Sequence, residues 1–242
     1  MVQDSSPTLH NLGEDGLLVE FGSSLMMEAN AAAIAFRRAL EGLRLRGVTE
    51  VGSTLKSAFI RFDPVALPHA QIIPKIKELM ADRDWLTAPM PEARHWELPS
   101  CFDGDFAPQI SEFSELSGIS ESDLIAQLSE TPLRVLALGF APGMPYLGQL
   151  PEGWNVPRQT SLTPRVPVGA ITAAIRQIVL FAVPSSTGWR QIGQAAWRGW
   201  DASGGPDQFL TAGDTLRFAP CGEGAFRAHL AAGGLLIERS SP

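Results

Sequence analysis

Two prolines that stand one residue apart divide the chain into parts with different patterns. Pro89 and Pro91 lie within residues 87–94, and a proline disfavours helix both at its own position and at the residue before it. This segment is therefore predicted to be an extended connector. We place a first domain at residues 1–88 and a second at residues 95–242. A chain of 242 residues can bury two separate cores without disulfides or metals.

The first part contains three short runs that are typical of strands. Residues 17–21 form an apolar run that Gly22 closes. Residues 48–52 and 57–62 are two more runs rich in apolar and β-branched residues. We expect these runs to pair in one small sheet.

Two helices are predicted between and after those strands. An apolar stripe with helical spacing covers residues 29–43, and Gly47 is expected to end this helix. A second helix carries the apolar residues of segment 72–80, where Pro74 either lies near the start or kinks the helix. The first part therefore predicts a small α/β sandwich with its helices on one face of the sheet.

The second part begins with helices and continues with short strands. Gly118 is placed to end a first helix, and Ser120 and Asp123 have the spacing of a capping box that opens a second. Short apolar or alternating runs punctuated by Gly and Pro follow at residues 135–140, 171–175, 178–183, 189–192 and 215–218. This pattern predicts an all-β barrel or sandwich, so the expected class for the whole chain is α+β.

Charge and composition exclude several classes of function. The formal net charge is −7, which argues against a nucleic-acid ligand and against docking on anionic membranes. No apolar run approaches the roughly 18 residues of a membrane span, and the start lacks a signal-peptide pattern, so a cytoplasmic protein is expected. The two cysteines and four scattered histidines give no metal-ligand spacing, so no metal site is predicted.

One segment carries an unusual concentration of glycine and proline around the only tyrosine of the chain, Tyr146. Glycines let a ligand approach the main chain, and prolines stiffen the loop so that its N–H groups could be preset donors for an anion. The alternative is a rigid corner of a β-barrel, because Gly and Pro are first of all turn residues. The binding candidates in this segment are Phe140, Pro142, Gly143 and Pro145.

Two arginines follow prolines further along the chain. Arg158 and Arg165 each come directly after a proline, and a planar guanidinium on an extended backbone suits a carboxylate or phosphate. The alternative is that both are ordinary surface arginines. Gly188 and Trp189 form a third candidate, either as one wall of a ligand site or as a tight turn before a core tryptophan.

Taken together, these segments resemble the PxpB family, which supplies one subunit of bacterial 5-oxoprolinase and is also described as allophanate hydrolase subunit 1 or KipI. The resemblance rests on GFAPGMPYLG, the spaced PR and PRVP, GWRQIG and, in the first part, DGLLVEFG and SAFIRFDP. It implies a small N-terminal α/β domain followed by a cyclophilin-like β-barrel.

The resemblance also implies a partner and a reaction. The chain would act with a larger subunit of the same enzyme, as a heterodimer or heterotetramer, in ATP-dependent hydrolysis of a lactam or amide. ATP would bind at the interface that the two subunits share.

The same resemblance assigns roles to residues. Arg158, Arg165 and Tyr146 are the catalytic candidates that it implies. The implied substrate-binding residues are Phe140, Pro142, Gly143, Pro145, Gln177, Gly188 and Trp189.

The sequence also departs from the family pattern. Leu128 and Leu133 stand where the family has a histidine and a tyrosine, Pro184 where it has a glutamate, and Gln194 where it has an arginine. Leucine and proline cannot replace an ionisable group. These departures motivate an alternative function, a binding protein that inhibits a sensor histidine kinase, as the KipI name suggests.

Overall fold

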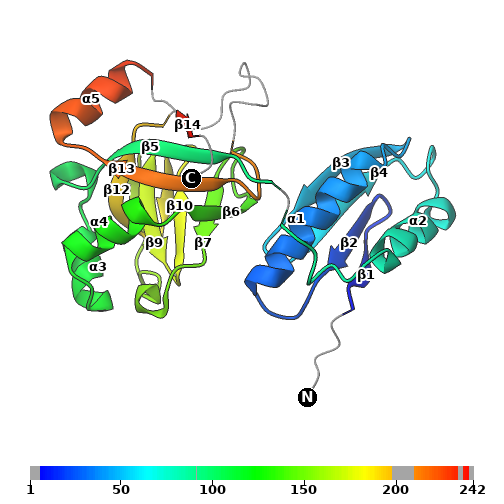
Figure 1. Cartoon of the computed structure of the whole chain (residues 1–242). Coiled ribbons are helices and arrows are strands. Elements are labelled where there is room, and N and C mark those ends of the chain that lie inside the picture. Colours follow the sequence, from blue (N-terminus) through cyan, green and yellow to red (C-terminus); the bar gives the residue numbers. More distant parts are fainter. Residues whose placement is uncertain (1–5, 91, 198–209, 234–236, 240–242) are drawn as a thin grey trace. The chain divides into compact units, whose positions relative to one another are not determined.

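A computed structural model describes residues 6–90, 92–197, 210–233 and 237–239 of the chain. The chain divides into two compact units, the first ending at Glu92 and the second beginning at Ala93 (Figure 1). This division lies inside the proline-containing segment 87–94.

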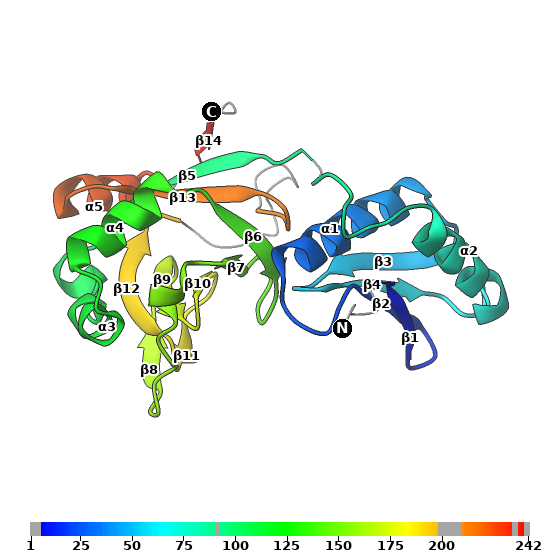
Figure 2. The same ribbon diagram turned by 60° about the horizontal axis from the view of Figure 1, so that its bottom comes forward.

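The first unit is a four-stranded sheet with two helices (Figure 2). Its strands pair in the order β1-β2-β4-β3, and every pair is antiparallel. The elements in chain order are β1 (Thr8–Leu12), β2 (Gly16–Glu20), α1 (Met27–Gly42), β3 (Val48–Ser53), β4 (Ser57–Phe62) and α2 (His69–Ala81).

Alternate residues of the central strands form the core of this unit. On β4, Ala58 and Ile60 are buried while Arg61 between Ile60 and Phe62 is exposed, as the two-residue period of a strand requires. Both helices contribute to the same core, α1 through Phe36 and α2 through Ile72. The helices therefore cover one face of the sheet, as predicted.

The end of α1 differs from the prediction. The helix stops at Gly42, not at Gly47, and Arg44 takes a left-handed backbone with φ of 46° while its N–H donates to the Glu41 carbonyl. Gly47 has a different role, because its φ is 95° and an added Cβ would lie 2.6 Å from the Cβ of Leu67. A close approach explains this glycine, and the stripe of apolar residues could not indicate it.

The second unit is built around a barrel. Its helices are α3 (Ile110–Ser117), α4 (Glu121–Glu130) and α5 (Glu223–Ala231). Its strands are β5 (His95–Cys101), β6 (Leu133–Leu138), β7 (Pro145–Gly148), β8 (Thr163–Val166), β9 (Ala170–Ala174), β10 (Gln177–Leu180), β11 (Ser185–Thr187), β12 (Arg190–Ala195), β13 (Thr215–Pro220) and β14 (Ile237–Arg239).

Seven strands close into the barrel. They pair in the order β12-β9-β10-β7-β6-β13-β5, and β12 pairs back onto β5 through Gln194 with Cys101 and Ala195 with Ser100. The pair β13–β5 is parallel. The predicted α+β class with a barrel in the second part is confirmed.

The predicted helix ends in this unit are also confirmed. Gly118 has φ of 70° and receives the end of α3, which is the usual left-handed glycine cap. The Ser120 hydroxyl accepts a hydrogen bond from the Asp123 N–H at 3.1 Å and begins α4.

Several elements of this unit were not predicted. Strands β7 and β8 contain prolines, which normally argue against a strand, but β8 pairs only with β11 in a two-stranded ribbon. Helix α5 was missed as well. Among the described residues, no helix combines the length and apolar character needed to span a bilayer.

Barrel closure predicts a difference between two glycine variants. Gly169 has φ of 80°, and an added Cβ would lie 2.3 Å from the Ala195 carbonyl oxygen on β12. Gly104 has φ of 51° but no atom within 4 Å of an added Cβ. Gly104→Ala should therefore cost only the left-handed backbone, about 1 kcal/mol. Gly169→Ala also disturbs the strand contact and should cost at least about 3 kcal/mol. Urea unfolding followed by circular dichroism measures both, and equal losses would contradict this account of closure.

Candidate functional site

The site with the best chemical content is a pocket of about 300 Å³ on the barrel unit. It lies where the β6–β7 loop, strand β10 and the turn between β11 and β12 come together with the segment before β8. Five residues singled out from the sequence line it together: Phe140, Tyr146, Arg158, Gly188 and Trp189.

Arg158, Trp189 and Tyr146 form the polar centre of this pocket. The guanidinium carbon of Arg158 lies 5.2 Å from the centroid of the Trp189 ring, within the range of a cation–π contact. Tyr146 meets the same ring edge-on, with the ring centroids 6.3 Å apart and the planes at 80°. Trp189 is buried, so one indole fixes both the cation and the phenol at a single place.

The charge of the pocket is one-sided. Arg158 is exposed and makes no ion pair among the described residues, and none of those that line the pocket is a carboxylate. The buried side chains of Val179 and Phe181 supply apolar walls. A small molecule with one negative group and an apolar body fits this chemistry.

The glycine- and proline-rich segment forms a tight turn at the edge of the pocket. Pro142 and Gly143 are its central residues, Gly143 has φ of 70°, and the Met144 N–H donates to the Ala141 carbonyl at 3.2 Å. This is the type II turn, which favours proline and then glycine at those two positions. The segment is therefore a barrel corner, and it also contributes to the pocket, because Phe140 beside the turn belongs to the lining.

Fewer N–H donors remain in this turn than the sequence suggests. The N–H groups of Gly139 and Met144 donate within the turn itself, and Pro142 has none. Phe140 takes a left-handed backbone with φ of 69° and is 76% exposed. An exposed aromatic residue in that conformation is uncommon and marks this corner as a place where backbone strain is tolerated.

The remaining candidates lie outside the lining of the pocket. Arg165 is exposed on β8, and Pro145 is buried at the start of β7. Gln177 is buried on β10, where alternation places it on the same face as Val179, which does line the pocket. The structure thus joins Arg158 to Tyr146 and Trp189 and does not place Arg165 with them. The roles given to these residues stay predictions.

Two lining residues were missed from the sequence. Gln159 follows Arg158, and its side-chain amide donates to the Trp189 carbonyl at 3.1 Å. Leu162 also lines the pocket and is 65% exposed. The only available signal was their position between the two proline–arginine pairs.

The departures from the family pattern do not touch this pocket. Leu128 and Leu133 are buried in the core of the barrel unit. Pro184 is exposed, and the Gln194 side chain donates to the Val168 carbonyl at 3.0 Å. None of the four belongs to the lining, so the lost ionisable groups remove nothing from it.

Metal and thiol chemistry find no support in the described part of the chain. No cluster of three or more His, Cys, Asp or Glu side chains suited to a metal lies in it. Both cysteines are free, and Cys101 is buried. Burial raises the pKa of the Cys221 thiol, and the neighbouring Cys101 raises it further. An activated thiol would show the opposite shift.

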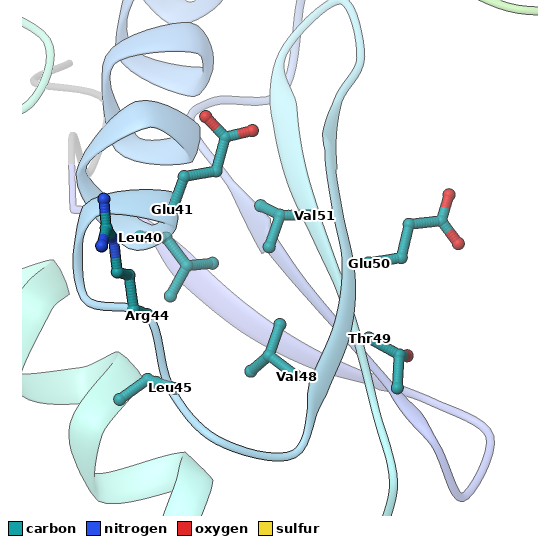
Figure 3. A pocket seen from close by; sticks show the side chains of 8 residues that line it. All are labelled: Leu40, Glu41, Arg44, Leu45, Val48, Thr49, Glu50 and Val51. Atoms are coloured by element: carbon teal, nitrogen blue, oxygen red, sulfur yellow. The ribbon is translucent and has the colours of Figure 1, made fainter.

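A second hollow lies in the first unit, between the end of α1 and β3 (Figure 3). Figure 3 shows Leu40, Val48 and Val51 pointing toward one another, while Arg44 and Glu50 point to opposite sides. Its charged groups do not converge, so the barrel pocket is the stronger candidate.

The fold and pocket agree with the comparison to known proteins. Residues 7–210 match the model of the carboxyltransferase domain, subdomain C and D, and the chain belongs to that family. Within this class it belongs to the PxpB family of 5-oxoprolinase subunits, as the sequence motifs predicted.

The relatives differ in how much of them the chain covers. The PxpB-type 5-oxoprolinase subunit of Bacillus subtilis (strain 168) is 24% identical over 91% of this chain and 95% of that protein. The same subunit of Escherichia coli O157:H7 is 32% identical over 55% of this chain and 62% of that protein. The crystal structure of TTHA0988 has a TM-score of 0.72 and 27% identity over 86% of this chain. The present chain spans only 40% of that longer chain.

The raised pKa of Cys221 predicts slow alkylation. A smaller thiolate fraction at a given pH lowers the rate with iodoacetamide, so the rate should rise only at higher pH than for an ordinary exposed thiol. Mass spectrometry of the intact chain between about pH 7 and 10, on either side of the ordinary thiol pKa, measures this. Cys221→Ser is the control for Cys101. A Cys221 that reacts at neutral pH as fast as glutathione would contradict the assignment.

Proposed function

We propose that this chain is the substrate-binding subunit of an ATP-dependent amide or lactam hydrolase of the 5-oxoprolinase type. In this proposal a small molecule with a carboxylate binds in the barrel pocket. The observation that carries it is the Arg158 guanidinium, which lies over Trp189 in a pocket whose described lining contains no carboxylate.

The pocket offers what such a substrate needs. Arg158 can hold a carboxylate through two parallel N–H donors. Val179 and Phe181 can cover the ring carbons, and the Tyr146 phenol can donate to a second oxygen. A volume of about 300 Å³ suits a ligand of this size.

We assign ATP to the interface with a larger subunit and not to this pocket. A triphosphate carries several negative charges, and the described lining presents one guanidinium and no lysine. The sequence also lacks the glycine-rich phosphate loop. In the reaction that the family implies, ATP phosphorylates the amide oxygen and ADP leaves, after which water adds, the C–N bond breaks and phosphate departs. This chain would bind and orient the amide.

The partner in this proposal is the larger subunit of the same enzyme. The curated relatives are named as subunits, which supports a multi-subunit assembly. The longer TTHA0988 chain offers room for further domains, since the present chain spans 40% of it. Inhibition of a histidine kinase stays a prediction, and the departures that motivated it lie outside the pocket.

Removal of the Arg158 charge tests this function. Arg158→Met should weaken the binding of 5-oxoproline by roughly tenfold to a hundredfold, because a charge-assisted hydrogen bond is worth about 1.5–3 kcal/mol. Calorimetric titration of the full chain with its larger subunit measures the affinity. Arg227→Met is the matched control, since Arg227 is an exposed guanidinium 5.0 Å from the Phe106 ring and outside the pocket. Equal affinity of Arg158→Met and the control would refute the proposed site.

A further inference from the structure

A second arginine lies behind the pocket and faces away from it. Arg190 is 7% exposed and does not belong to the lining. Its Nε donates to Glu112 Oε1 at 2.8 Å, and its Nη1 donates to the Pro157 carbonyl at 2.8 Å. The charge of Arg190 is thus compensated by Glu112, and its remaining contact reaches the residue directly before Arg158.

The residue directly after Arg158 is held as firmly. The Gln159 N–H donates to the Gly188 carbonyl at 2.7 Å. The Gln159 side chain donates to the Trp189 carbonyl at 3.1 Å and to Thr163 Oγ1 at 3.2 Å. Both neighbours of Arg158 are therefore tied to the short segment that carries Trp189.

That segment is itself anchored by the residues at the start of α3. The Gln109 N–H donates to the Gln191 carbonyl, and the Gln191 N–H donates back to Gln109 Oε1, each at 3.0 Å. The Gln109 amide also donates to Gln159 Oε1 at 2.8 Å. Arg190, Gln159 and Gln109 thus form one hydrogen-bonded frame behind Arg158.

We propose that Arg190 is a positioning residue, which with Glu112 and Gln159 fixes the Arg158 guanidinium over Trp189 before a ligand arrives. This inference rests on the proposed function for the role of Arg158, but the position of Arg158 can be measured without any ligand. A buried arginine is costly unless its partners are complete. Here those partners fix the backbone on one side of the cation, and a fixed cation loses less freedom when it binds an anion.

The Trp189 ring provides a direct readout of this position. Protons held above an indole ring resonate upfield, so the side-chain methylene signals of Arg158 should be shifted from those of a free arginine peptide. Spectra of the full chain with isotope-labelled arginine record this shift, Arg158→Lys assigns the signals, and Trp189→Leu defines its loss. Arg190→Met should move the Arg158 signals to the position seen in Trp189→Leu.

A matched control separates positioning from general loss of stability. Arg94 also forms a partly buried ion pair, 2.7 Å to the nearly inaccessible Asp214, and lies outside the pocket lining. Arg94→Met should lower the melting temperature and leave the Arg158 signals shifted. If Arg190→Met does not fold, Gln159→Leu decides with the same readout, because it removes the clamp on the other side of Arg158.

Affinity for 5-oxoproline supplies the second measurement. Arg190→Met should weaken binding by roughly tenfold, as expected when a binding group loses its preset position. The inference is overturned if Arg190→Met, or Gln159→Leu in its place, keeps the ring-shifted Arg158 signals. If Arg158→Met binds 5-oxoproline as well as the unmodified chain, the proposed function fails, while the ring shift still decides whether Arg190 positions Arg158.

Discussion

The pairing of β12 with β5 closes the barrel, and the pocket depends on it. This pairing joins Gln194 to Cys101 and Ala195 to Ser100 and turns an open sheet into a ring of seven strands. It requires glycine on β12, since a Cβ at Gly193 would lie 2.7 Å from the Phe102 ring. Because β12 begins at Arg190, closure also fixes Trp189, the residue just before it, as a wall of the pocket.

The pocket combines a rigid aromatic surface with a cation that no carboxylate in the described part of the chain neutralises. Trp189 contacts Arg158 on its face and Tyr146 at an edge, so three side chains from different elements converge at one point. The frame of Arg190, Gln159 and Gln109 lies on the other side of the same backbone. Polar groups that would compete for a ligand are thus used behind the pocket and leave one guanidinium in front.

The sequence predicted most of the architecture because local rules decide most of it. Apolar periodicity located α1 and the core of β4, and the Ser120 cap and Gly118 marked helix ends correctly. Contacts between distant residues decided the rest. Gly47 is required by Leu67 rather than by a helix end, and β7 exists because β6 and β10 pair on both its sides in spite of Pro145.

The site shows the same division. Tyr146, Arg158 and Trp189 were found from glycine, proline and arginine spacing and from family motifs, and they meet in space. Arg165 has the same local pattern as Arg158, but β8 pairs with β11 and leaves Arg165 exposed outside the lining. Arg190 could not be identified at all, because its partners Glu112 and Pro157 lie far from it in the sequence.

The central claim is that Arg158 and Trp189 form the place where the carboxylate of a substrate binds. A crystal structure of the chain with its larger subunit and 5-oxoproline tests it most directly. We predict density for the ligand in the barrel pocket, with its carboxylate within hydrogen-bond distance of the Arg158 guanidinium. A ligand bound elsewhere in the complex, with Arg158 still exposed to solvent, would contradict the account.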